Sequence, residues 1–169
     1  FHVVTDSRDQ VFEAAFEGNN SATSTVVNVF LTPPPDLFVT EITVPDSLSA
    51  EQSFLLRWDV TNQGASTAEG GWFDRAYVST RDRFVVGVAT SLGQVFRSPA
   101  LAVGDGYSAQ LNATLPNNLA GTLYFYVVTD QSNRLFEFTG EDNNTSRSDS
   151  VIVSAPDLAI TTFSAPAAA

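Results

Sequence analysis

Carboxylate and amide side chains that could bind a metal ion occur twice in this chain with the same spacing. The first set is Asp6, Glu13, Glu17, Asn19 and Asn20, and the second is Asp130, Glu137, Glu141, Asp142, Asn143 and Asn144. In both sets the first Glu follows the Asp by 7 residues, and the first Asn follows it by 13. Calcium takes six to eight such oxygen ligands in flexible geometry. The pattern therefore makes these residues a candidate Ca²⁺ site, although their spacing is not that of an EF-hand.

A purely structural interpretation of the same residues stays open. Asn-Asn pairs are common in turns, because Asn tolerates left-handed backbone geometry and bonds to its own backbone. Asp130 can accept hydrogen bonds from backbone N–H groups at the end of a strand. Glu137, between Phe136 and Phe138, can point to solvent. Under this interpretation the conserved spacing fixes a turn and does not mark a ligand.

The duplication extends beyond these side chains. Residues 1–31 align with 125–155, with 13 of 31 positions identical, and residues 35–45 align with 156–166, with 5 of 11 identical. A period near 120 residues indicates whole domains in tandem, since solenoid repeats are shorter. The predicted organisation is the C-terminal part of a preceding repeat at 1–31, a Pro-rich linker at 32–35, a complete domain at 36–155 and the start of a following repeat at 156–169.

The elements that position the candidate residues have the pattern of strands. Phe54, Leu56, Trp58, Val60 and Asn62 alternate with less apolar residues, as in a half-buried strand. Further strands are expected at 36–43, 72–79, in two short pieces within 85–96, and at 107–115, 122–129 and 146–154. No stretch has convincing helical periodicity. Seven to nine short strands separated by turn residues predict an antiparallel β-sandwich, in which 127–144 belongs to the closing hairpin.

The terminal segments are too short to fold independently. Residues 1–31 supply only two expected strands, 1–5 and about 21–31, and two strands alone are marginal in water. We expect them to need the rest of a preceding module or a partner chain, and the same applies to a strand at 157–163. Residues 1–5 and 26–29 are then candidate contact strands between chains. The Pro-rich linker favours extended polyproline geometry and a semi-rigid spacer.

Charge and composition exclude several classes of function. The chain has 19 acidic residues against 8 basic ones, all of them Arg, and a net charge of −11. Such a chain repels phosphate backbones, so nucleic-acid binding is not expected. There is no Cys and no apolar run long enough to insert in a membrane. His2 is the only histidine, and the chain has no HExxH or phosphate-binding glycine motif, so we expect no enzyme activity.

Other side chains allow a binding or a structural interpretation. Trp58, Trp72, Phe73 and Tyr77 could form an aromatic platform for carbohydrate, although the alternation around Trp58 favours a core position and one of Trp72 and Phe73 should face outward. Arg75 is expected to form an ion pair with Asp74 or Asp59 across strands. Sequons begin at Asn19, Asn112, Asn143 and Asn144, and these are glycan acceptors only where the machinery exists.

An ordered set of segments resembles a known family. The segments PDLFVTEITVP, LLRWDVTNQG, WFDRAYVST, LPNNLAGTLYFYVVTD and FEFTGEDNN are similar to the CARDB domain, the cell-adhesion-related domain of prokaryotic surface proteins. The resemblance implies an immunoglobulin-like β-sandwich carried in tandem in large secreted or surface-anchored proteins, with no general enzymatic activity. One departure lies at 79–85, where family members often carry several acidic residues and this chain keeps only Asp82.

Taken together, the sequence predicts a non-catalytic structural or adhesive repeat of an extracellular or cell-surface protein, which can assemble into a filament or sheath. The expected partners are neighbouring repeats of the same chain, or identical chains. The alternative is a carbohydrate- or calcium-binding accessory domain of a secreted enzyme, with surface glycans or other surface proteins as partners.

Overall fold

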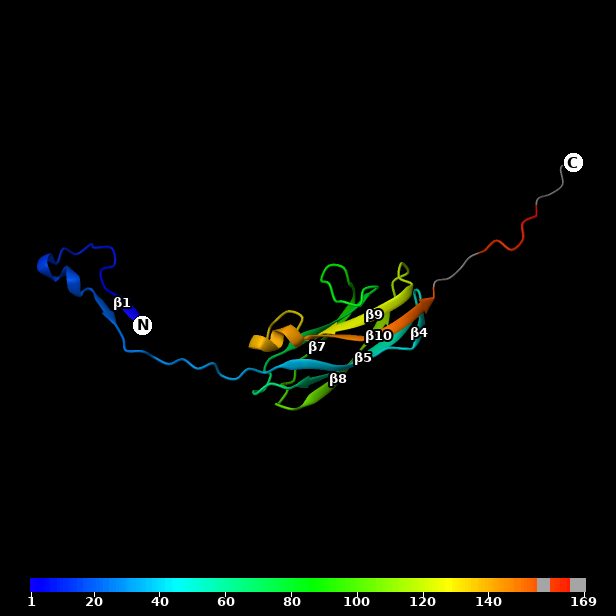
Figure 1. The fold of residues 1–169 in the computed structure, drawn as a ribbon, viewed down its shortest axis with the longest axis horizontal. Coiled ribbons are helices and arrows are strands. Elements are labelled where there is room, and N and C mark those ends of the chain that lie inside the picture. The colour runs from blue at the N-terminus through cyan, green and yellow to red at the C-terminus, as the bar shows by residue number, and fades with distance from the viewer. Residues whose placement is uncertain (155–158, 165–169) are drawn as a thin grey trace. The chain divides into compact units, whose positions relative to one another are not determined.

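The computed structural model of the chain describes residues 1–154 and 159–164 (Figure 1). The chain divides into two compact units, Phe1–Thr32 and Pro33–Ala169, and each is described separately. Within the described residues, no helix is long and apolar enough to cross a membrane.

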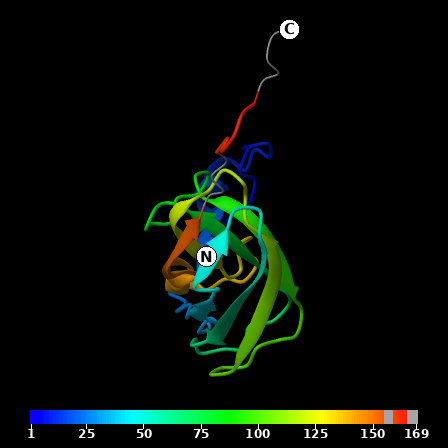
Figure 2. The ribbon, with the colours of Figure 1, turned by 90° about the vertical axis from the view of Figure 1, so that its right-hand side faces the viewer.

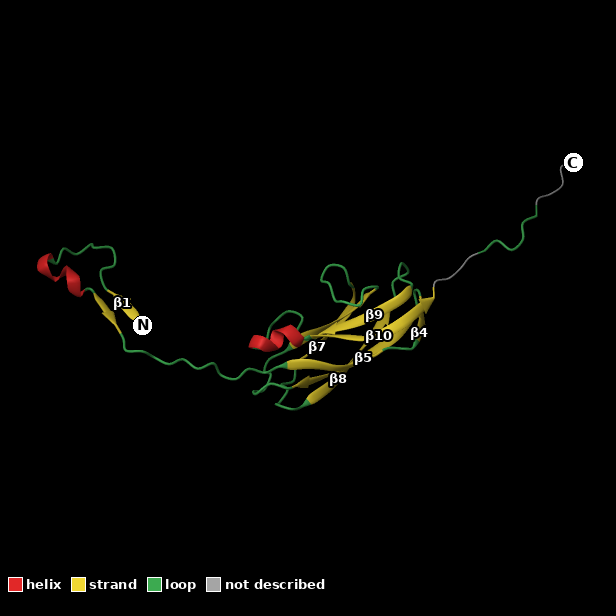
Figure 3. Cartoon of the chain, viewed as in Figure 1, coloured by secondary structure: helices red, strands yellow, loops and turns green. Residues whose placement is uncertain are grey.

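The second unit contains eight strands and one short 3₁₀ helix among its described residues (Figure 3). The elements are β3 (Leu37–Thr43), β4 (Ser47–Ser49), β5 (Ser53–Asn62), β6 (Trp72–Ser79), β7 (Thr90–Arg97), β8 (Gly106–Thr114), β9 (Gly121–Val128), η2 (Phe138–Asn143) and β10 (Thr145–Ser154). One sheet has the order β3-β5-β8 and the other β4-β10-β9-β6-β7. Figure 2 looks along the length of this unit, where the strands surround a common interior. The all-β prediction is confirmed, and β9 and β10 form the expected antiparallel pair.

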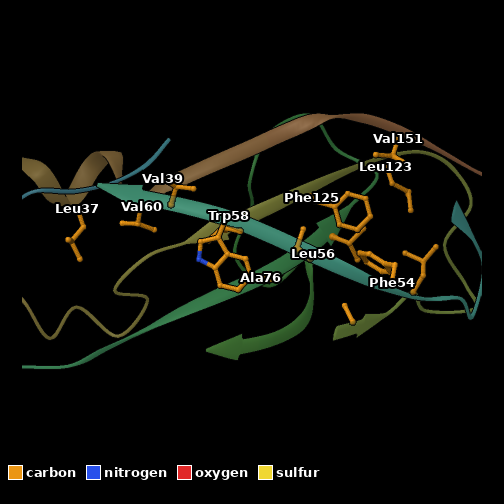
Figure 4. Packing of buried hydrophobic residues seen from close by; sticks show 14 of the residues in the cluster. Leu37, Val39, Phe54, Leu56, Trp58, Val60, Ala76, Leu123, Phe125 and Val151 are labelled. Carbon is orange, nitrogen blue, oxygen red and sulfur yellow. The ribbon is translucent and has the colours of Figure 1, made fainter. Parts of the chain in front are cut away.

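The core lies between the two sheets and follows the alternation in the sequence. In β5 the buried residues are Phe54, Leu56, Trp58, Val60 and Asn62, every second position of the strand. They face buried side chains of the other sheet, as Figure 4 shows for part of the cluster: Ala76, Leu123, Phe125 and Val151. The ring of Phe54 meets that of Phe125 edge-on, at 5.5 Å between centroids. Burial of this apolar surface is the main stabilising term of the sandwich.

Three local features differ from the sequence prediction. A 3₁₀ helix, η2, stands where only a loop was expected, because short 3₁₀ turns need no apolar periodicity. Residues 85–89 form a loop, so the two expected strand pieces reduce to the single strand β7. The pair β4–β10 is parallel, whereas the other pairs within the two sheets of this unit are antiparallel.

The last residues of the Pro-rich linker are already part of the second unit. Ala65 N donates to Pro34 O at 3.0 Å, and Gln63 N donates to Asp36 O at 2.8 Å. A Cβ added at Gly64 would lie 2.4 Å from Asp36 N, so only glycine allows this close approach. The chain therefore enters β3 along a fixed path.

The first unit contains β1 (His2–Val4), η1 (Ala14–Asn19) and β2 (Ser21–Thr23). The prediction of a strand over about 21–31 is wrong beyond Thr23. In the second unit, the later residues of β10 pair with 121–124 of β9, whereas β2 pairs only with His2–Val4 of β1. The strand predicted at 157–163 lies partly outside the described residues, and its described part, 159–163, is not a strand.

Candidate functional site

The two acidic loops of the chain have the same conformation. Asp130 Oδ1 accepts from Arg134 N at 3.0 Å and Oδ2 accepts from Leu135 N at 2.7 Å. Asp6 bonds in the same way to the backbone N atoms of the residues four and five positions later, both at 2.8 Å. The positive φ angles also match, 40° at Asp130 and 41° at Asp6. Both aspartates therefore hold a tight turn after a strand, as the structural interpretation of the sequence predicted.

The strands that carry these loops share one register as well. In the second unit Thr145 pairs with Val128 and Ser146 with Val127. In the first unit Ser21 pairs with Val4 and Ala22 with Val3, which are the same pairs 124 residues earlier in the chain. Residues 1–23 thus reproduce the start of the hairpin 125–147 in both pairing and loop geometry.

Glu137 points inward, contrary to the expectation that it could face solvent. Its side chain is only 1% exposed, and its Oε2 accepts from Leu37 N at the start of β3, at 3.3 Å. Burial raises the pKa of Glu137 to about 7. The hydrogen bonds from the Leu37 backbone and the Asn144 side chain act in the opposite direction and lower this pKa. The carboxylates of Glu141 and Asp130 raise it further. Glu137 therefore ties the loop to the strand that follows the linker.

Neighbouring residues reinforce this attachment. Asn143 Nδ2 donates to Asp36 Oδ1 at 2.9 Å, and Glu141 Oε1 accepts from Glu137 N at 2.9 Å. A Cβ at Gly140 would lie 2.9 Å from Asp36 Oδ1, so the 3₁₀ helix packs directly on Asp36. The loop and the end of the linker form one hydrogen-bonded junction.

The six residues of the second candidate set are only partly brought together. Glu137, Asn143 and Asn144 lie in the junction, and one side-chain oxygen of each is buried without a hydrogen-bond partner. Asp130 and Glu141 bond to backbone N–H groups, and Asp142 is exposed. Among the described residues, no three His, Cys, Asp or Glu side chains form a group that could hold a metal ion.

A buried polar network that the sequence did not reveal crosses the core. Asp74, on the inner face of β6, is 1% exposed. Its Oδ2 accepts from Trp58 Nε1 at 2.9 Å and from Tyr107 Oη at 2.6 Å, and its Oδ1 accepts from Thr129 Oγ1 at 2.8 Å. Trp72 Nε1 in turn donates to Tyr107 Oη at 3.0 Å. Burial raises the pKa of Asp74, and the hydrogen bonds from Tyr107, Trp58 and Thr129 lower it in part. The network joins the two sheets, so its role is structural.

This network overturns two expectations from the sequence. Arg75 does not pair with Asp74 or Asp59; its guanidinium donates to Gln94 Oε1 on β7, because Arg75 lies on the opposite face of β6 from Asp74. Trp58 and Trp72 are buried in the core, so the proposed four-residue aromatic platform does not exist. Phe73 packs on Phe96 at the sheet's outer face, as expected for one member of the Trp72-Phe73 pair.

The four sequons differ in accessibility. Asn19 and Asn112 are exposed, and Asn143 is partly buried. Asn144 is 6% exposed and lies in the junction, which disfavours its modification in the folded state. His2 bonds through Nδ1 to Thr23 Oγ1 at 2.9 Å across the first hairpin.

Comparisons with known proteins place these observations in context. The CARDB family model matches residues 34–148. The crystal structure of a CARDB domain from Pyrococcus furiosus, solved in complex with di-metal ions, matches with a TM-score of 0.54 and 20% identity over 75% of this chain and 100% of that chain. The solution structure of that domain matches with a TM-score of 0.51 and 20% identity over 72% of this chain and 97% of that chain. These likenesses show the fold. A comparison with curated protein sequences finds no match.

The di-metal ions of the Pyrococcus domain raise the question of whether residues of this chain fit a metal. The loop at 79–85 does not fit, because Arg81 and Arg83 flank its single carboxylate, Asp82. In the junction, the unpartnered groups of Glu137, Asn143 and Asn144 are all oxygen acceptors, the type of ligand that Ca²⁺ takes, and Glu137 is the one carboxylate among them.

Proposed function

The chain belongs to the CARDB family, and from this premise we propose that it is a non-catalytic structural repeat of a larger extracellular or cell-surface prokaryotic protein. Each sandwich acts as a spacer, and successive sandwiches project the protein from the surface or assemble it into a filament or sheath. The partners are neighbouring repeats of the same chain or identical chains.

One observation carries this proposal: the first unit repeats a hairpin whose apolar residues need the rest of a sandwich to cover them. Five apolar positions of the first unit have counterparts 124 residues later that are buried in the core. The pairs are Phe1 and Phe125, Val3 and Val127, Val11 and Leu135, Val27 and Val151, and Val29 and Val153. Phe1 is 85% exposed against 0% for Phe125, and Val3 is 67% exposed against 0% for Val127. Two strands alone cannot bury these side chains, so further strands must cover them in a folded repeat.

The second unit supplies the template for what covers that surface. There, the equivalent side chains pack against strands β3 and β5 of the opposite sheet and β6 of their own. We infer that residues 1–31 close a second sandwich of the same type. The residues that lead into β3, Pro34 and Asp36, are hydrogen-bonded to Ala65 and Gln63 within the second unit.

A chimeric domain tests this equivalence. In the chimera, residues 33–124 are followed by residues 1–31 in place of residues 125–155. The chimera is compared with the parent domain, residues 33–155. We expect cooperative urea unfolding and buried Trp58 and Trp72 fluorescence in both. Val3→Asp in the chimera should abolish folding, as Val127→Asp should in the parent. A second chimera replaces only 125–144 with 1–20. The proposal would be contradicted if the parent domain folds and both chimeras remain unfolded.

A calcium site at the junction is a second proposal, supported by the unpartnered oxygens of Glu137, Asn143 and Asn144. Oxygen-rich loops of this kind suit Ca²⁺, which would bind the loop to Asp36 at the entry to β3. The test is a thermal melt of the whole chain with Ca²⁺ and with EDTA. We expect a higher midpoint with Ca²⁺ in wild type and no difference in Asn144→Ala; an unchanged wild-type midpoint would contradict the site.

A further inference from the structure

The loop between β6 and β7, residues 80–89 (green in Figure 1), contacts the outer face of the five-stranded sheet through Phe84. The ring of Phe84 lies 5.0 Å from that of Tyr77 and 5.4 Å from that of Tyr126, measured between centroids. Tyr126 Oη donates to Arg81 O at 2.7 Å, and Arg147 Nη1 donates to Asp82 O at 3.0 Å. These contacts fix the loop, so the surface it presents is formed before any ligand arrives.

An open groove of about 460 Å³ lies between this loop and the sheet. Its lining residues are Thr80, Arg81, Asp82, Arg83, Val85 and Tyr124. The guanidinium of Arg147 lies over the Tyr124 ring, 4.9 Å from its centroid. Arg81 and Arg83 in the lining and Arg147 over the Tyr124 ring thus form a local group of three arginines on a chain whose net charge is −11.

The two arginines of the groove have donors available. Both are exposed, and among residues 1–154 and 159–164 neither side chain donates a hydrogen bond within the chain. A guanidinium recognises a carboxylate through paired N–H donors, which a lysine does not match. The groove therefore offers guanidinium donors to an anion, with the carboxylate of Asp82 beside them.

The position of the groove argues against an acidic peptide as its ligand. The sheet residue in its lining is Tyr124 of β9, a strand that is paired on both sides, with β6 and with β10. No free strand edge is available there for a peptide to extend the sheet. An aromatic ring beside exposed guanidinium groups suits a sugar ring that bears a carboxylate, because the ring offers an apolar face and the arginines bind the charge.

We propose that this groove binds an acidic polysaccharide through its uronic acid carboxylates, with Arg81 and Arg83 binding the charge and Tyr124 contacting a sugar ring. This binding is independent of the proposed structural role. An array of spacer domains does not require it, and a single domain contains the whole groove.

Isothermal titration calorimetry of the whole chain with trigalacturonic acid tests the proposal, with its methyl ester as the uncharged match. We expect binding of the acid that weakens with added NaCl, since exposed charges are screened by salt. The double variant Arg81→Gln, Arg83→Gln should lose at least about tenfold in affinity. The control Arg57→Gln, an exposed arginine on β5 of the other sheet, should bind as wild type. Near-ultraviolet circular dichroism confirms that each variant is folded.

Several results would overturn the assignment. Absence of trigalacturonate binding would do so, as would equal binding of the methyl ester or unchanged binding by the double variant. Tighter binding of a tri-glutamate peptide than of trigalacturonate would show that the groove selects an acidic peptide and not a sugar.

Discussion

The polar network around Asp74 makes a quantitative prediction about stability. In Asp74→Ala three buried donors, Trp58 Nε1, Tyr107 Oη and Thr129 Oγ1, lose their acceptor. Each buried group left without a partner costs about 1–3 kcal/mol. Removal of a carboxylate that burial disfavours offsets part of this cost. We therefore expect the free energy of unfolding to fall by about 3–5 kcal/mol, a large share of the ~5–15 kcal/mol of a typical domain.

The conservative variant separates hydrogen bonding from charge. In Asp74→Asn the amide oxygen can still accept from Trp58 and Tyr107, and the amide nitrogen can donate to Thr129, whose hydroxyl also accepts. The expected loss is only about 1 kcal/mol. Asp59→Ala is the matched control, because Asp59 bonds to the exposed Ser108 hydroxyl, and it should change stability by no more than about 0.5 kcal/mol.

Urea unfolding followed by tryptophan fluorescence measures these differences, since Trp58 and Trp72 are both buried. The reasoning would be refuted if Asp74→Ala lay within about 1 kcal/mol of wild type, since unpaired buried donors would then cost far less than expected. Equal losses in Asp74→Ala and Asp74→Asn would also refute it, because the amide keeps the acceptor.

Three further predictions follow from individual contacts. Burial raises the pKa of Asp74 above 3.8 in the folded state, so the contribution of Asp74 to stability falls as pH rises from the unfolded pKa through the folded one. The variant Asp74→Asn lacks this titration. In urea titrations its stability relative to wild type should therefore increase over that pH range. Gly64→Ala should destabilise the chain by about 2–3 kcal/mol in thermal melts, because the added Cβ would meet the Asp36 backbone. Gly18→Ala is the control and should be neutral, because a Cβ added at Gly18 would meet no atom within 4 Å. Phe84→Ala should cost about 1–3 kcal/mol, because two aromatic pairs are lost, and it should make loop 80–89 susceptible to limited proteolysis.

The sequence predicted the architecture well where alternation was strong. The five buried positions of β5 were visible because a half-buried strand has a period of two. The duplicated loop that begins at Asp130 could also be predicted from the sequence. Local residues set the geometry of a turn, so the same residues in the first unit give the same turn. The 3₁₀ helix of this loop was missed, because a single short turn leaves no periodic signal.

The polar contacts could not be predicted, because they join residues far apart in the chain. Asp74 and Arg75 looked like members of one surface ion pair, yet alternation along β6 places them on opposite faces. The partners of Asp74 come from β5, β8 and the end of β9, and only the packing of two sheets brings them together. The inward position of Glu137 likewise depends on the entry of the chain into β3.

Amide hydrogen exchange on the whole chain tests the central claim most directly, namely that 33–154 folds as a sandwich, whereas β1 and β2 of the first unit form a two-stranded hairpin that needs further strands for stability. The measurement compares the amides of Val127 and Val3, which occupy equivalent positions. We expect Val127 to exchange at least about a thousandfold more slowly than in an unfolded chain, because its exchange requires global unfolding. Val3 should exchange close to the unfolded rate, since two strands alone are marginal. Equal protection of the two amides would contradict the account.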